Sequence, residues 1–281
     1  MCEVLDVTRQ GFNKWLKSKD KPHKHEALLA LIKQVLGEDG ENHINYGTRR
    51  IYLALINKYD YQGSYSTVCR VCRDNDITLP KKRKSRGLTK ADSEAQKSEN
   101  LINQDFTAAS PNEKWLSDIT EVPCADGKLY VAPVLDCYDG AIVGLAMDDN
   151  MRKELCISAF EQACRTHSAF GMIFHSDRGS QYTSSDFRAS LKKHGAIQSM
   201  SGTGRCYDNA RMESFFATLK KEKLYRINTS ILPMETVKTI IWRFTFSYYN
   251  RRRVYTTNNG WPPLVYRKMY YDNLIQNKVA A

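Results

Sequence analysis

The chain has 281 residues, of which 42% are hydrophobic and 26% charged, an ordinary globular balance that does not favour disorder. Its 42 Lys and Arg against 31 Asp and Glu leave a formal net charge of +11, which favours a polyanionic partner, nucleic acid before a membrane surface. No run approaches the roughly 20 apolar residues of a membrane helix and the N-terminus does not have the pattern of a signal peptide, so we expect a cytoplasmic protein without a membrane segment.

Residues 1–80 are predicted to form a small all-α domain. Apolar residues recur at helical spacing in four short segments, the first with Thr8 as N-cap and the fourth with Ser66 as N-cap. In the fourth segment we expect Arg70 and Arg73 to face outward, away from the apolar positions. Short helices with a basic outer face are typical of a helix-turn-helix DNA-binding domain, and a helical bundle with solvated arginines is the equal alternative.

The eight cysteines do not form a framework, so we expect free thiols in a reducing cytosol. The one pair that suggests a zinc site is Cys69 and Cys72, together with His23 and His25. The two histidines have the wrong spacing for the usual two-histidine half of such a site, and a single C-x-x-C is a weak signal. We therefore expect no structural zinc.

Residues 81–104 are polar, charged and nearly free of large apolar side chains, as is typical of a linker. Three short apolar or alternating runs follow within 113–149, and helical and strand patterns then alternate as far as Ser201. This order predicts an α/β fold with a mixed five-stranded sheet flanked by helices. Pro133 interrupts the second run, and because proline removes a ladder donor we expect an edge or a bulge there.

Three acidic residues fall where this fold brings elements together. Asp118 lies in the first strand, Asp177 ends the fourth, and Glu213 borders the apolar stripe of a helix. Converging carboxylates repel one another unless a cation compensates them. Mg²⁺ prefers such oxygen ligands, and a pair of ions can activate the attacking oxygen and stabilise the leaving oxygen of a phosphoryl transfer.

The strings around these acids, "WLSDIT", "FHSDRGSQYTS" and "CYDNARMESFFATLKKE", closely resemble the Asp-Asp-Glu triad of bacterial insertion-sequence transposases with a retroviral-integrase-type core. The 35 residues between Asp177 and Glu213 fit the family's pattern. The resemblance covers about Leu101 to Arg253, and the N-terminal part resembles the second reading frame of two-frame elements. Two positions depart from the pattern: Tyr255 stands where a histidine is expected, and Gly202 and Thr203 stand where a basic residue is common.

The resemblance implies a ribonuclease H-like catalytic core, which we place at 105–228, with a C-terminal helix and a basic, aromatic tail at 229–281. It also implies Mg²⁺ or Mn²⁺, with two ions held by Asp118, Asp177 and Glu213. The implied reaction is cleavage at the 3′ ends of an element followed by strand transfer, by direct phosphoryl transfer. The alternatives are a nuclease with the same core and a DNA-binding regulator with an inactive core.

The implied partners are double-stranded DNA of the element ends and target, and a first-frame product or frameshift fusion. We also expect a homo-oligomer on DNA and association with the bacterial nucleoid when DNA is bound.

Several further residues have both a functional and a structural interpretation. Lys220 follows Glu213 by seven residues, about two helical turns, and is predicted to contact DNA, with a solvated lysine as the alternative. Arg178 and His175 are predicted DNA contacts beside Asp177, and His175 has the alternative role of fixing the Asp177 loop. Asp136 and Asp139 are interpreted as strand-end and turn residues, and Asp208 or Asn209 as the cap of the Glu213 helix.

Overall fold

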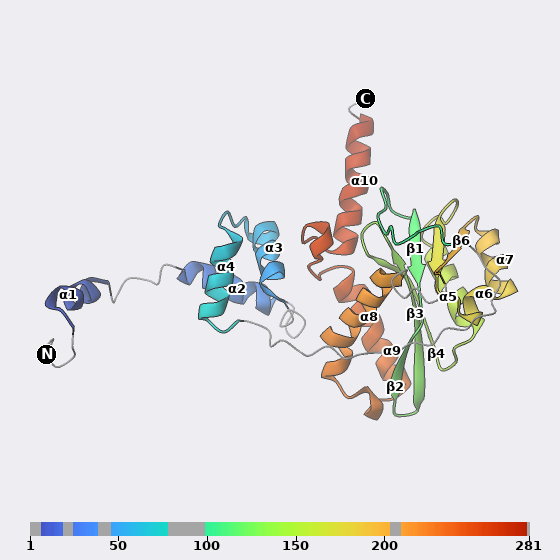
Figure 1. Cartoon of the computed structure of the whole chain (residues 1–281), viewed down its shortest axis with the longest axis horizontal. Coiled ribbons are helices and arrows are strands. Elements are labelled where there is room, and N and C mark those ends of the chain that lie inside the picture. Colours follow the sequence, from blue (N-terminus) through green and yellow to red (C-terminus); the bar gives the residue numbers. More distant parts are fainter. Residues whose placement is uncertain (1–6, 19–24, 39–45, 78–98, 203–208, 280–281) are drawn as a thin grey trace. The chain divides into compact units, whose positions relative to one another are not determined.

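The computed structural model describes residues 7–18, 25–38, 46–77, 99–202 and 209–279 (Figure 1). The chain divides into two compact units, residues 1–81 and residues 82–281. The predicted linker lies largely outside the described residues, as do His23, Thr203 and Asp208.

The first unit contains the four predicted helices, α1 (Arg9–Ser18), α2 (Glu26–Gly37), α3 (Thr48–Tyr59) and α4 (Tyr65–Asp74). Thr8 caps α1 as predicted, because its hydroxyl accepts the N–H of Gly11 at 3.0 Å. The predicted cap of α4 is wrong by two residues. The helix begins earlier, so Ser64 rather than Ser66 accepts the N–H of Thr67.

Helices α2, α3 and α4 pack around a shared apolar core that includes Ile32, Ile51, Leu55, Val68, Val71 and Cys72. Arg70 and Arg73 are exposed on α4, as the helical spacing predicted. Cys69 and Cys72 are free thiols, and the buried position of Cys72 raises its pKa to about 11. Its thiol therefore stays protonated near neutral pH.

The second unit is built on a mixed sheet with helices on both faces (Figure 1). Its strands are β1 (Lys114–Ser117), β2 (Thr120–Cys124), β3 (Gly127–Asp136), β4 (Ile142–Asp148), β5 (Ile173–Ser176) and β6 (Ile197–Met200). Its α-helices are α5 (Lys153–Cys164), α6 (Ser180–Thr183), α7 (Ser185–Lys193), α8 (Ala210–Glu222), α9 (Met234–Trp242) and α10 (Pro263–Val279). A π-helix, η5 (Arg243–Tyr249), continues α9, and short 3-10 turns are η3 (Leu224–Arg226), η4 (Thr229–Ile231) and η6 (Thr256–Asn258).

β1 and β2 are two halves of one strand. Ser117 pairs with Val134 and Thr120 pairs with Val131, which is a single antiparallel register against β3. The sheet therefore has five strands in the order β4, β3, β1/β2, β5, β6, with β5 and β6 parallel to β1. This confirms the predicted fold class, a ribonuclease H-like mixed sheet flanked by helices.

The interruption between β1 and β2 falls at Asp118, and the shared register places Pro133 opposite it. Proline has no N–H to donate, so the ladder cannot close at this point. Ser117 Oγ donates to the Pro133 carbonyl at 2.9 Å, and the N–H of Ile119 donates to the Asp118 carboxylate at 2.8 Å. Of the two expectations for Pro133, an edge is wrong because β3 pairs on both sides, whereas a bulge agrees with the shift in the register of β3 against β4 between Val134 and Leu135.

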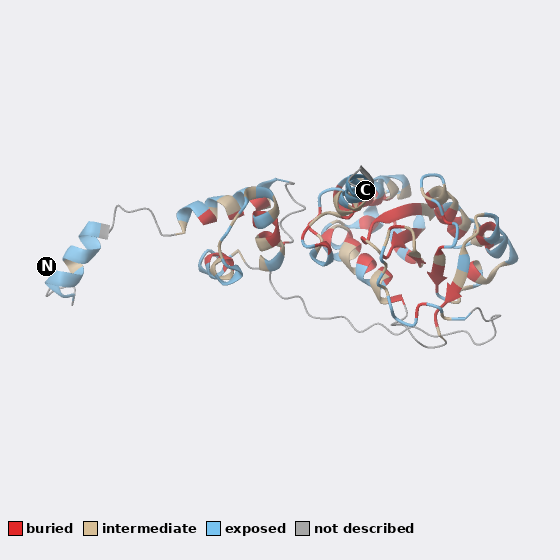
Figure 2. Ribbon diagram, turned by 90° about the horizontal axis from the view of Figure 1, so that it is seen from above, coloured by how far each residue is buried: buried red, intermediate tan, exposed pale blue. Residues whose placement is uncertain are grey.

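Alternating side chains of the strands divide the core into two layers. The sheet between the flanking helices is largely buried (Figure 2). Leu116, Val131 and Leu135 pack under α8, α9 and η5. Trp115, Ala132 and Val134 pack under α5, α6 and α7. Period-two alternation of apolar residues on both faces is the pattern of a sheet covered by helices on each side.

The C-terminal residues 229–281 belong to the same compact unit as the predicted core 105–228. Val237, Ile241, Phe244 and Tyr249 complete the layer on the α8 side of the sheet. The Asn250 side chain exchanges two hydrogen bonds with the backbone of Ile142, of 2.9 and 3.0 Å. This amide therefore takes the place of a strand partner where β4 begins.

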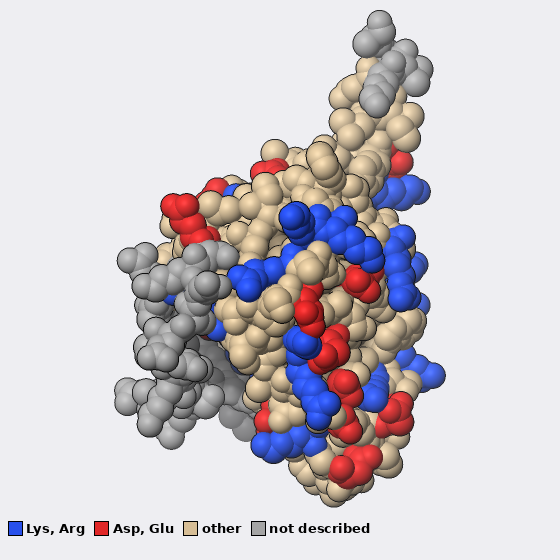
Figure 3. All heavy atoms as spheres, turned by 90° about the vertical axis from the view of Figure 1, so that its right-hand side faces the viewer, with Lys and Arg blue, Asp and Glu red and all other residues tan. Residues whose placement is uncertain are grey.

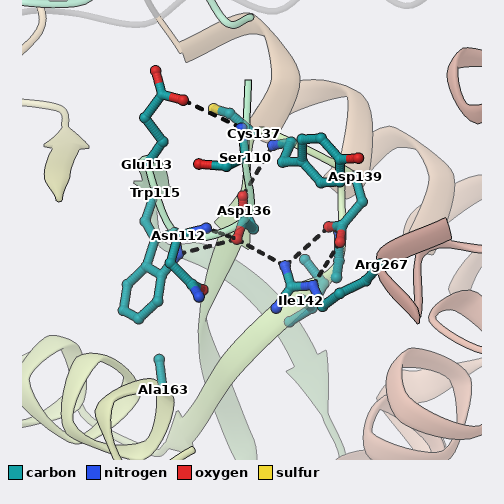
Figure 4. Close-up of polar contacts among 12 residues, drawn as sticks. Ser110, Asn112, Glu113, Trp115, Asp136, Cys137, Asp139, Ile142, Ala163 and Arg267 are labelled. Carbon is teal, nitrogen blue, oxygen red and sulfur yellow. Dashed lines mark hydrogen bonds and ion pairs between the residues drawn. The ribbon is translucent and has the colours of Figure 1, made fainter. Parts of the chain in front are cut away.

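A buried ion cluster joins α10 to the turn between β3 and β4 (Figure 4). Arg267 donates to Asp136 at 2.7 Å and to Asp139 at 2.6 and 3.1 Å, and both carboxylates are fully buried. Asp136 also accepts the N–H of Asn112 and of the Trp115 ring, and the N–H of Tyr138. The two acids are strand-end and turn residues as predicted, and their pairing with a side chain more than 120 residues away is a finding of the structure.

Among the described residues, no helix combines the length and the apolar character needed to cross a membrane.

Replacing Arg267 with alanine should lower the free energy of unfolding by about 3–5 kcal/mol, because it leaves two buried carboxylates without their cation. Urea denaturation at neutral pH measures this change. Lys268→Ala, at an exposed neighbouring position of α10, should change the same quantity by less than about 0.5 kcal/mol. Equal effects of the two substitutions would show that the cluster does not hold α10.

Candidate active site

The register between β1 and β5 places Asp118 and Asp177 side by side. Trp115 pairs with Phe174 and Leu116 with His175 in parallel orientation, and the same offset extended beyond the strands brings Asp118 level with Asp177. Both residues follow the C-terminal ends of neighbouring parallel strands. Adjacent strands lie about 4.8 Å apart, so the two side chains begin close together. This position is open to solvent, because Asp118 is half-buried and Asp177 is exposed.

Glu213 reaches the same region from α8, which packs against β1. Asn209, at the N-cap position of this helix, donates from Nδ2 to the carbonyl of Ser117, the residue before Asp118, at 3.2 Å. Glu213 follows one helical turn later. Asn209 thus occupies the predicted cap position, but its side chain makes no capping hydrogen bond and instead ties the helix to β1.

The electrostatics of Asp118 show that these charges are near one another. Burial, and after it the negative charges of Asp177 and Glu213, raise the pKa of its carboxyl to about 7, against the opposing effects of the Ile119 N–H and the Lys220 ammonium. The protein around Asp177 also removes water from its carboxyl and raises its pKa, although the residue is exposed. Glu213 is exposed on α8.

A buried chain of hydrogen bonds connects the segments that carry the two aspartates. The Tyr182 hydroxyl on α6 lies 2.8 Å from Ser117 Oγ, which donates onward to the Pro133 carbonyl. Tyr182 follows Asp177 by five residues, so this contact connects the Asp177 segment to the strand of Asp118. Gly179 also donates its N–H to Asp177 at 3.0 Å, which fixes the turn after β5.

The predicted DNA contact of His175 is wrong. The side chain is fully buried, and its two ring nitrogens lie 2.8 and 3.2 Å from the hydroxyls of Ser199 and Ser201. It therefore joins β5 to β6, which agrees with the alternative role of fixing the Asp177 loop. Arg178 is half-buried and donates from Nε to the Ser201 carbonyl at 2.6 Å.

Among the described residues, no three His, Cys, Asp or Glu side chains lie close enough together to hold a metal ion as they stand. Repulsion among carboxylates without a cation favours their separation. The three oxygen donors are nevertheless of the type that Mg²⁺ and Mn²⁺ prefer, and they couple electrostatically. The donor set therefore fits a hard divalent cation.

Positive charge is not in excess in the segment that carries these acids. Residues 105–228 contain 15 Lys and Arg against 16 Asp and Glu, whereas residues 229–281 contain 8 against 2. Figure 3 shows one face of the molecule on which basic and acidic side chains are interspersed. The excess positive charge of the chain therefore comes from the segments on either side of residues 105–228.

Signals for the supporting residues were weak in the sequence. Asn209 precedes Glu213 by four residues, about one helical turn, and this spacing is the one signal that could have linked it to the acids. Ser117 and Tyr182 are a common strand residue and a common aromatic residue, and only the packing of α6 against the sheet brings them together.

Comparison with known proteins gives consistent matches. A family model described as the integrase core domain matches residues 108–206. A 31 kDa protein of insertion element IS600 from Shigella sonnei is 35% identical over 277 residues, covering 97% of this chain and 99% of that protein. Transposase InsF for insertion sequence IS3A from Escherichia coli (strain K12) is 32% identical over 265 residues, covering 94% of this chain and 91% of InsF.

Solved structures with a similar chain path include the intasome of simian T-cell lymphotropic virus in complex with a PP2A regulatory subunit, at a TM-score of 0.45 and 15% identity. That match covers 80% of this chain and 70% of the other. The HTLV-2 integrase catalytic core domain in complex with magnesium has a TM-score of 0.42 and 20% identity, over 57% of this chain and 98% of the other.

Asp118→Asn should stabilise the metal-free protein at pH 8, on the order of 2 kcal/mol, because it removes a carboxylate whose ionisation the fold disfavours. A carboxyl whose folded pKa lies near 7 and whose unfolded pKa lies near 4 costs stability above pH 7, and this cost disappears progressively as the pH falls to about 4. Urea denaturation with a chelator across this range measures the difference. A gain that does not change between pH 8 and pH 4 would contradict the raised pKa.

Proposed function

The chain belongs to the family of insertion-sequence transposases that includes InsF and is a DNA transposase, and we propose that Asp118, Asp177 and Glu213 form its catalytic centre. The observation that carries this proposal is the strand register that brings Asp118 level with Asp177, beside the helix of Glu213. We propose that the reaction is cleavage at the element's 3′ ends followed by strand transfer.

Asp118, Asp177 and Glu213 would together hold two Mg²⁺ or Mn²⁺ ions, since carboxylate oxygens are the ligands that these cations prefer. When bound, such ions activate the attacking oxygen and stabilise the leaving oxygen of a phosphoryl transfer. The raised pKa of Asp118 means that metal and proton compete for its carboxyl near neutral pH. The hydrogen bonds of Ile119 and Gly179 orient the two aspartates toward the open side of the sheet.

DNA retention is proposed to depend mainly on the segments outside the core. The exposed Arg70 and Arg73 on α4 suit contact with the phosphate backbone, as expected for a helix-turn-helix-like unit. Arg178 is proposed to lie near the reacting strand because it follows Asp177. Action as a homo-oligomer on DNA, in the bacterial cytoplasm and with a first-frame product or frameshift fusion, also belongs to this proposal.

Asp118→Asn, Asp177→Asn and Glu213→Gln should each reduce cleavage and joining of element-end DNA by more than about 100-fold, because each removes a metal ligand. Retention of the same DNA in a filter or gel assay should stay close to that of the unmodified chain, since the basic residues are unchanged. The test uses labelled DNA of the element ends with and without Mg²⁺, with the chain alone and as a frameshift-type fusion. Cleavage without joined products would indicate a nuclease, and a substitution with near-normal joining would exclude that residue from the centre.

Lys220→Ala should weaken binding to element-end DNA and lower the salt dependence of binding by about one counterion. The positive charge of Lys220 acts on Asp118, which supports a position on the catalytic side of α8. Lys221→Ala is the matched control, because Lys221 is exposed and points about 100° away around the helix. Equal salt slopes for the two variants would show that this face of α8 does not touch DNA.

A further inference from the structure

The catalytic helix α8 has two functional faces. Glu213 and Lys220 are seven residues apart and lie on one face. Arg211, Phe215 and Glu222 are spaced by four and seven residues, so they form a second stripe, about 160° away around the helix. The charges of the first stripe act on Asp118, and the second stripe contacts the C-terminal segment.

Glu222, at the end of the second stripe, is held by Arg253. Arg253 donates from Nε and Nη2 to the two carboxylate oxygens, each at 2.9 Å, and both side chains are buried. A buried bidentate arginine and carboxylate pair fixes the direction as well as the distance of its two partners. The C-terminal end of α8 is therefore fixed against residues that follow the π-helix.

Further contacts between α8 and the segment 249–255 follow toward the N-terminal end of the helix. Arg253 lies over the Tyr249 ring at 5.3 Å, and Tyr249 packs edge-on against Phe215 with ring centroids 5.0 Å apart. Tyr249 also contacts Tyr255, whose hydroxyl hydrogen bonds with Arg211. Three residues of the segment 249–255 thus contact the second stripe at both ends and in the middle.

Arg211 and Tyr255 also contact the segment before β1 and the turn between β3 and β4. Arg211 donates from Nη1 to the carbonyls of Phe106 and Cys137, the first at 2.9 Å. Tyr255 lies against Gly140, where a Cβ would come within 2.7 Å of the hydroxyl oxygen and where φ is +75°. Glycine is therefore required at this turn both for its backbone conformation and for the approach of the tyrosine.

We propose that the segment 249–255 positions Glu213 by bracing α8 from the face opposite the active site, with Arg253 and Tyr255 as positioning residues. This inference rests on the proposed catalytic role of Glu213 and adds how its helix is held at the distance that a shared metal site requires. It also gives a function to Tyr255, which stands where the family pattern has a histidine, since the tyrosine hydroxyl is the group that reaches Arg211.

The run of three arginines offers a matched control. Arg251 is exposed, whereas Arg253 is buried in the contact with Glu222. Arg253→Lys retains the charge but loses the bidentate geometry, and Arg251→Lys makes the same chemical change on the surface. Tyr255→Phe removes only the hydroxyl and leaves the ring in place, so it tests the brace with the smallest change in packing.

The experiment uses the full chain and two readouts besides cleavage. Amide hydrogen exchange in the metal-free protein reports whether α8 opens more readily than the sheet. Mn²⁺ titration followed by electron paramagnetic resonance reports affinity for the metal, with Glu213→Gln as the reference for loss of a ligand. In Arg253→Lys and Tyr255→Phe we expect faster exchange in α8 with unchanged exchange in β3 and β5, and Mn²⁺ affinity weakened by about tenfold. Saturating Mn²⁺ should restore cleavage, and Arg251→Lys should behave as the unmodified chain.

Two outcomes would overturn the inference. Exchange that rises equally in α8 and in the strands would show that the segment contributes stability alone, and Mn²⁺ affinity equal to that of the unmodified chain would show that Glu213 needs no brace. If Glu213→Gln itself binds Mn²⁺ normally, the proposed metal role of Glu213 fails. The exchange measurement then still decides whether the segment 249–255 holds α8.

Discussion

The parallel pairing of β1 with β5 is the constraint on which the rest of the site depends. It brings Asp118 level with Asp177, each one residue beyond the end of its strand, so that two like charges face the same edge of the sheet. The cost appears as a raised pKa of Asp118, to which burial, Asp177 and Glu213 all contribute. Backbone hydrogen bonds between β1 and β5 set this register, so it does not depend on a bound cation.

The sheet accommodates this arrangement through a local gap in its own ladder. Pro133 lies opposite Asp118 and offers no N–H, so the backbone around the aspartate is released from regular pairing. Side chains replace the lost contacts, since Ser117 bonds to the Pro133 carbonyl and Tyr182 bonds to Ser117. A proline, which would weaken an ordinary central strand, here lies opposite the gap between β1 and β2 in which Asp118 is found.

The C-terminal residues complete the catalytic unit. Asn250 pairs with the backbone of β4, Arg267 neutralises two buried carboxylates, and Arg253 holds the end of α8. The first two contacts fix β4 and the turn between β3 and β4, and the third fixes the helix that carries Glu213. The division of the chain at residue 228 therefore separates parts that fold together, and the basic composition of the tail hides the fact that two of its arginines are internal.

The sequence by itself determined the alternation of strands and helices, the three acids and their spacing, because period-two and 3.6-residue patterns and short motifs are local properties. It also indicated that Arg70 and Arg73 face outward. Only the tertiary structure decided that His175 is internal, that Asn209 ties α8 to β1, and that Asp136, Asp139 and Arg253 are neutralised by distant partners. A charged side chain looks the same in a sequence whether water or an opposite charge surrounds it, and that choice is made by contacts between residues more than 20 positions apart.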